Sequence, residues 1–113
     1  MEDLKLTLKF SSGAELMIKD EIRADAGTKT GDLELTRTLP ATTDGKPTIA
    51  KDLLEFIRDN LIKDRQEDFY DKEKLRPGIL VIINGSDWEV EDGPEYRLQN
   101  NDTVEFISTL HGG

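Results

Sequence analysis

Apolar and polar residues alternate without interruption from Leu4 to Phe10, which is the period of a β-strand with one buried face. Ser11, Ser12 and Gly13 follow, and a glycine can adopt the positive φ that a short hairpin loop often needs. Apolar residues then recur at every second position from 14 to 18. The pattern therefore predicts a β-hairpin with strands at 4–10 and 14–19.

Residues 20–46 differ in character, because Thr, Asp, Gly and Lys dominate them. Two glycine-containing stretches in this segment are typical of loops, so we predict a variable loop over 20–46. Leu33, Leu35 and Leu39 are separated by polar residues. These three leucines could therefore form a short edge strand, which is the alternative to a loop over the whole segment.

A helix is predicted at 49–61, with Thr48 as its N-cap. At 100° per residue, its apolar positions fall within an arc of roughly 160°, so the helix can cover one face of a sheet. The charged segment 64–74 suits a loop or a short helical turn, with Phe69 and Tyr70 as anchors.

Five consecutive aliphatic residues at 79–83 indicate a strand that is buried beyond one face. Asn84-Gly85 predicts a turn into a short strand near Trp88, and the last strand is expected at 103–109. The order of elements predicts an α+β fold with one main helix on a mixed four- to five-stranded sheet. With the first and last strands adjacent in its middle, this is a β-grasp (ubiquitin-like) roll.

Composition narrows the possible chemistry. The 113 residues include 15 basic and 24 acidic side chains, for a net charge of −9, with one histidine and no cysteine. We expect a single domain over 1–113, with no catalytic residue, bound cofactor or metal site. The charge argues against direct binding to nucleic acid or an anionic membrane. No apolar run reaches the ~20 residues that span a bilayer, so we expect a soluble protein. We also expect it to be a monomer.

Acidic residues are concentrated in segment 86–105, where Arg97 is the only basic residue. This acidic face either keeps the protein soluble and protects strand edges or forms a docking surface that attracts a basic partner. The acidic residues concerned are Asp87, Glu89, Glu91, Asp92, Glu95, Asp102 and Glu105.

The chain ends in Gly112 and Gly113, directly after the last predicted strand. We predict a flexible tail over 110–113, which at 3.3–3.6 Å per residue reaches about 13–14 Å. Two residues without side chains can enter a narrow channel and present a carboxylate there. A partner that adenylates this carboxylate with ATP would allow sulfur or an amine to attack it. The chain would then be a carrier and not an enzyme, whereas the alternative is a frayed end.

Five parts of the chain carry specific sequence motifs. They are Gly13-Ala14-Glu15-Leu16, the predicted helix, Arg76-Pro77-Gly78-Ile79-Leu80-Val81-Ile82-Ile83-Asn84, Asp87-Trp88-Glu89 and Phe106-Ile107-Ser108-Thr109-Leu110-His111-Gly112-Gly113. Together these motifs resemble the eukaryotic ubiquitin-related modifiers of the sulfur-carrier type. The spacing of Leu98 and Asp102 is shared more widely among β-grasp carriers.

The resemblance implies that an E1-like activating enzyme with a rhodanese-like domain uses ATP to adenylate Gly113, which then becomes a thiocarboxylate. A tRNA thiolation complex would pass the sulfur to wobble uridine, and the same tail would be joined to lysines of target proteins, notably under oxidative stress. It also implies that Leu110, His111 and Gly112 are recognised by the activating enzyme. Such a protein is expected in the cytoplasm, with the nucleus as a second location.

One departure and two alternatives accompany this resemblance. Segment 20–46 is longer than the usual link between second strand and helix in the family, which puts partner contacts at that edge in doubt. The alternatives are the small sulfur-carrier subunit of a cofactor-synthesis enzyme, and a ubiquitin-fold interaction module whose tail is never used. His111 matches the motif, either as a docking residue or as a tail histidine without a role.

Overall fold

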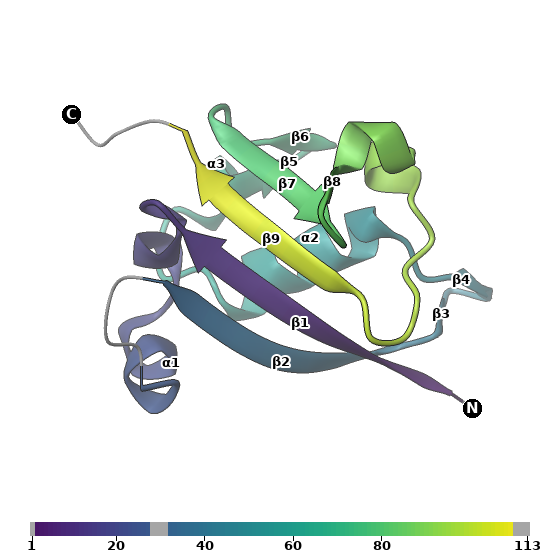
Figure 1. The fold of residues 1–113 in the computed structure, drawn as a ribbon, viewed down its shortest axis with the longest axis horizontal. Helices are drawn as coiled ribbons and strands as arrows, with labels where there is room; N and C mark the ends of the chain where they lie inside the picture. The colour runs from purple at the N-terminus through teal and green to yellow at the C-terminus, as the bar shows by residue number, and fades with distance from the viewer. Residues whose placement is uncertain (1, 28–31, 110–113) are drawn as a thin grey trace.

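The fold is built on one mixed five-stranded sheet with a single long helix, α2, packed on one face (Figure 1). The structure is a computed structural model and describes residues 2–27 and 32–109. The strands follow the order β2-β1-β9-β7-β8 across the sheet. Their bounds are β1 Asp3–Ser11, β2 Leu33–Pro40, β7 Ile79–Ile83, β8 Ser86–Asp87 and β9 Thr103–Ser108, and α2 is Ala50–Asn60.

Shorter elements connect these parts. Two small two-stranded sheets, β3 with β4 and β5 with β6, lie before and after α2 in the chain. The bounds are η1 Ala14–Met17, α1 Asp20–Asp25, β3 Thr42–Thr43, β4 Lys46–Pro47, α3 Gln66–Phe69, β5 Tyr70–Asp71, β6 Lys74–Leu75, η2 Trp88–Glu91 and η3 Gly93–Glu95.

The first and last strands lie side by side in the middle of the sheet. β1 and β9 run parallel, from the pair Thr7 and Thr103 to the pair Ser11 and Ile107. β2 is antiparallel to β1, and β7 is antiparallel to β9. The predicted α+β roll with one main helix on a mixed sheet is therefore confirmed.

The core forms between the inner face of the sheet and α2. The Phe10 and Phe106 rings of the two central strands stack with centroids 5.0 Å apart, and Phe69 tilts against Phe106 at 6.2 Å. Regular alternation along β1 sends every second side chain inward. The other core residues from β1, α2 and β9 are Leu4, Leu6, Leu8, Leu53, Leu54, Ile57 and Val104.

The predicted second strand at 14–19 is wrong. Residues Ala14–Met17 form the 3₁₀ helix η1, and the antiparallel partner of β1 is β2. Gly13, at φ 107°, precedes η1, and its amide donates to the buried Glu15 carboxylate at 2.9 Å. This local hydrogen bond turns the chain, and three alternating positions were too few to separate a strand from a tight helical turn.

The loop predicted over 20–46 also needs correction. The segment contains α1, β2 and β3 and reaches the start of β4. The edge-strand alternative is the one observed, because β2 pairs along β1 from Leu33 to Pro40. Since β2 is the second strand of the sheet, only residues 41–49 link it to α2. The departure inferred from the sequence therefore took the wrong segment as the link between the second strand and the helix.

The start of α2 differs from prediction by one residue. Ile49 is the N-cap, and its amide donates to the Asp52 carboxylate at 2.9 Å. Thr48 is buried and donates its hydroxyl to the Pro40 carbonyl at 2.6 Å. Its oxygen also hydrogen-bonds the Thr43 hydroxyl. Thr48 therefore joins the end of β2 to β3 and does not cap the helix.

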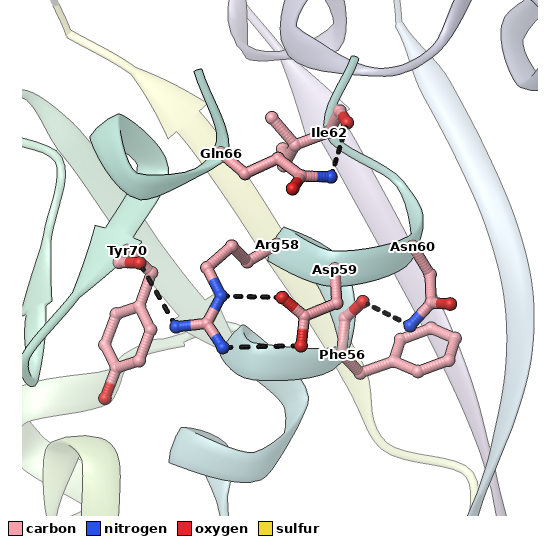
Figure 2. A network of polar contacts seen from close by, with 7 residues as sticks. All are labelled: Phe56, Arg58, Asp59, Asn60, Ile62, Gln66 and Tyr70. Carbon is pink, nitrogen blue, oxygen red and sulfur yellow. Dashed lines mark hydrogen bonds and ion pairs between the residues drawn. The ribbon is translucent and has the colours of Figure 1, made fainter. Parts of the chain in front are cut away.

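Polar contacts join the end of α2 to the α3–β5 segment (Figure 2). Arg58 donates to the Asp59 carboxylate at 2.8 Å and to the Tyr70 carbonyl at 3.5 Å, and its guanidinium lies 6.0 Å from the centre of the Tyr70 ring. The hydrogen bond between Arg58 and Asp59 raises the pKa of Arg58 and lowers the pKa of Asp59. Phe69 and Tyr70 are buried, which confirms them as the anchors of segment 64–74.

Asp102 is the buried polar centre of the turn that precedes β9. It is only 4% exposed, and its carboxylate accepts hydrogen bonds from the Asn84 amide, the Tyr96 hydroxyl and the Gln99 backbone amide, each at 2.8 Å. Its backbone carbonyl accepts from the Thr7 amide of β1 at 3.0 Å. Asp102 therefore does not belong to the acidic face in which the sequence placed it.

Replacing Asp102 with alanine should lower the free energy of unfolding by about 3 kcal/mol, because three donors lose their acceptor in a buried place. Urea denaturation followed by tryptophan fluorescence measures this change. The matched control is Asp3→Ala on the exposed end of β1, which should stay within about 0.5 kcal/mol of the parent protein. Equal midpoints for both variants would contradict the role of Asp102.

Tyr96 should make stability depend on alkaline pH. Burial and the hydrogen bond to Asp102 raise the pKa of Tyr96 from 10.0 to about 12. A raised pKa means that the neutral phenol is favoured in the folded protein, so its contribution is complete below pH 10 and is lost as the pH rises toward 12. The difference in tyrosinate absorbance between the parent protein and Tyr96→Phe should therefore have its midpoint well above pH 10, and a midpoint at the ordinary tyrosine value would refute this assignment.

Candidate functional site

The candidate site begins where the chain leaves β9. Thr109 is the last described residue, and its backbone amide donates to the Gly78 carbonyl at 2.6 Å. Its hydroxyl donates to the same oxygen at 2.8 Å. Gly78 has φ 89°, in the left-handed region that glycine adopts readily. Both donors of Thr109 are therefore tied to the turn that precedes β7.

The turn between β1 and η1 contacts the end of β9 from the other side. A Cβ atom built on Gly13 would lie 3.7 Å from the Cβ of Ser108. Gly13 is also hydrogen-bonded to Glu15, so this turn is held in place. The end of β9 thus lies between two glycine-containing turns, one from each neighbouring strand.

The predicted site residues themselves, Leu110, His111, Gly112 and Gly113, lie outside the described residues. The structure describes the place from which they continue. That place is the end of central strand β9, which pairs with β1 as far as Ile107 and with β7 as far as Ser108. The contacts of Thr109 with Gly78 continue the attachment on the β7 side. The sequence placed Thr109 in the last strand and Gly78 in a turn, but no sequence signal linked two residues that are 31 positions apart.

The face of the sheet opposite α2 carries an apolar patch of Leu80, Ile82 and Ile107. Leu80 pairs with Ile107 across β7 and β9, and the alternating neighbours of all three point into the core. All three are half-buried. In Figure 1, α2 lies behind the sheet, so the face of the sheet opposite α2 is toward the viewer. The patch therefore lies on the same two strands that hold the tail.

Thr109 and the Gly78 carbonyl that it contacts are called the tail base here. A groove of about 620 Å³ lies beside the tail base. It opens between η1, the loop before α3 and the turn before β7, and Leu16, which is 55% exposed, lies on its wall. Its floor includes Ile79 and Ser108, which pair across β7 and β9 and lie on the inner face of these strands. The groove and the apolar patch are therefore on opposite faces of the sheet.

The acidic face keeps most of its members at the surface. Asp87, Glu89, Glu91, Asp92 and Glu95 lie along β8, η2 and η3. Among them Val90 is 77% exposed, while Trp88 is partly buried and packs against the core.

Neither a metal centre nor a membrane-spanning helix is found in the described parts of the chain. Within residues 2–27 and 32–109, no group of three His, Asp or Glu side chains could hold a metal ion. None of the helices there is both long and apolar enough to cross a bilayer.

The pKa shifts resolved for Arg58, Asp59, Tyr70 and Tyr96 arise from burial and from contacts that hold the fold together.

The order of the five strands and the one main helix on the sheet define a ubiquitin-like β-grasp protein. A family model described as Urm1 (Ubiquitin related modifier) matches residues 5–113. The chain belongs to this family, which confirms the resemblance drawn from the sequence.

Individual relatives support the assignment along the whole chain. Ubiquitin-related modifier 1 of Mycosarcoma maydis is 41% identical over 113 residues, covering 99% of this chain and 97% of the relative. That of Gallus gallus is 42% identical over 110 residues, covering 97% and 96%. The solution structure of Urm1 from Trypanosoma brucei matches with a TM-score of 0.67 and 36% identity, covering 100% of this chain and 99% of that one.

Membership of this family makes the chain a small protein of the ubiquitin-like modifier and sulfur-carrier kind, and not an enzyme. The family implies an E1-like activating partner and conjugation to proteins in general.

Proposed function

We propose that the protein is a sulfur carrier whose Gly113 carboxylate is activated and thiocarboxylated by an E1-like enzyme with a rhodanese-like domain. A carboxylate oxygen attacks the α-phosphate of ATP and pyrophosphate leaves. The terminal sulfur of a cysteine persulfide on the rhodanese-like domain then attacks the acyl carbon and displaces AMP, which gives an acyl disulfide. A second thiol of the enzyme attacks the cysteine sulfur of this acyl disulfide, so that an enzyme disulfide forms and the thiocarboxylate is released. The observation that carries the proposal is the tail base, where Thr109 holds the end of a central strand against Gly78.

The loaded tail has two uses in this proposal. It supplies sulfur to a tRNA thiolation complex for the wobble uridine, and it is joined through an isopeptide bond to lysines of target proteins. The net charge of −9 supports a division of labour in which another protein holds the tRNA. The activating enzyme recognises the tail through Leu110, His111 and Gly112. The protein acts in the cytoplasm, with the nucleus as a second location.

The apolar patch of Leu80, Ile82 and Ile107 is proposed as the surface that docks on the activating enzyme. It lies on β7 and β9, so an enzyme bound there would hold the strand from which the tail continues. Half-buried aliphatic side chains on an open sheet face provide apolar area for such a contact.

Incubation with the activating enzyme, ATP and a sulfur donor should raise the intact mass by the difference between sulfur and oxygen. A variant that ends at Gly112 should show no such increase, since the reactive carboxylate is displaced by one residue. Intact-mass spectrometry measures both, with Asp3→Ala as a loaded control. If the parent protein keeps its mass under conditions that load a family relative, the proposal fails and an interaction module with an unused tail is favoured.

Ile107→Thr should raise the KM for adenylation about tenfold, because most of the apolar contact of one aliphatic side chain is lost. The value of kcat should stay the same, since the tail is intact. Pyrophosphate release measures both constants. Val90→Thr replaces a methyl group with a hydroxyl group on an exposed residue outside the patch and should leave KM unchanged. An equal effect of the two variants would exclude the patch as the docking surface.

A further inference from the structure

The Thr109 side chain makes a contact that the fold does not need. The backbone amide of Thr109 already donates to the Gly78 carbonyl, and the hydroxyl adds a second hydrogen bond to the same oxygen. Thr109 is exposed, so the second bond contributes little to stability. We propose that the Thr109 hydroxyl is a positioning group that sets the direction in which the tail enters the activating enzyme, an inference that rests on the proposed function.

Two hydrogen bonds to one acceptor hold Thr109 more firmly than one. A single N–H···O bond leaves the peptide free to rotate about the line between donor and acceptor. The hydroxyl bond at 2.8 Å removes that freedom, because χ1 of a β-branched residue is itself restricted. The orientation of the Thr109 backbone is thereby defined.

The acceptor is also held in place. Pro77 restricts the backbone before Gly78, and the Arg76 amide donates to the carbonyl of buried Phe69 at 2.8 Å. Ile79, directly after Gly78, pairs with Ser108. The Gly78 carbonyl is therefore linked to both the core and the sheet, and Thr109 is bound to a rigid partner.

Small errors at Thr109 become large at the reacting carboxylate. An enzyme channel that held the four following residues extended would fix them over about 13–14 Å. A rotation of about 10° at Thr109 would then move the far end of that extended segment by roughly 2 Å. A displacement of about 1 Å in a reacting group can cost a large part of the rate. A single hydroxyl at the base can therefore affect turnover while it hardly affects folding.

The test uses Thr109→Val, which keeps the shape and the backbone donor but removes the hydroxyl, and Thr109→Ser, which restores the hydroxyl. Thr38→Val, on exposed edge strand β2, controls for the change of residue type. In pyrophosphate-release assays with the activating enzyme, Thr109→Val should lower kcat about fivefold, the equivalent of one hydrogen bond. KM should change less than twofold because docking is unaffected, and Thr109→Ser should recover the parent kcat.

A second measurement needs no enzyme. The ¹⁵N order parameter of the residue 109 amide should fall in Thr109→Val and return in Thr109→Ser, with unchanged melting temperatures. If the parent protein is adenylated but Thr109→Val has the parent kcat, or if the serine variant is as slow as valine, the inference is overturned. An unloaded parent protein would overturn the proposed function, and an unchanged order parameter would separately remove the basis for positioning.

Discussion

The parallel pairing of β1 with β9 depends on Asp102, the residue directly before β9. Its carbonyl accepts from Thr7 of β1, while its buried carboxylate holds Asn84, at the end of β7, together with Tyr96 and Gln99. One residue therefore sets β9 in register with both neighbouring strands. A parallel pair cannot be joined by a tight turn, so its register must be set by contacts far apart in the chain, and a buried carboxylate with three donors supplies such contacts.

The rest of the functional architecture follows from this register. Once Asp102 is placed, Phe106 meets Phe10 in the core, and Ile107 meets Leu80 on the open face. Thr109 then reaches the Gly78 carbonyl at the opposite end of the strand. The six residues of β9 are held at both ends by hydrogen bonds to groups outside the strand. The tail base, the apolar patch and the core contact are thus three consequences of one placement.

Sequence patterns predicted the parts of this arrangement that depend on local order. Strict alternation marked β1, five aliphatic residues marked β7, and the order of elements predicted the β-grasp. Errors arose where a local hydrogen bond outweighed the pattern, as at Glu15 in η1, or where a polar residue served a distant segment, as Thr48 serves Pro40. Asp102 resembled its acidic neighbours in sequence because burial depends on the folded turn. The contact between Thr109 and Gly78 could not be predicted either, because its acceptor is a backbone carbonyl, which every residue has.

The distribution of reactive groups explains why a stable fold suits a carrier that lacks its own chemistry. The chain has no cysteine, and its single histidine lies in the tail. The shifted pKa values belong to groups that bind one another or lie buried within the fold. In the proposed function the carrier presents one terminal carbonyl to several partners in turn, so its tail must carry few side chains while its base must not move. The central strand satisfies the second requirement, and the two terminal glycines satisfy the first.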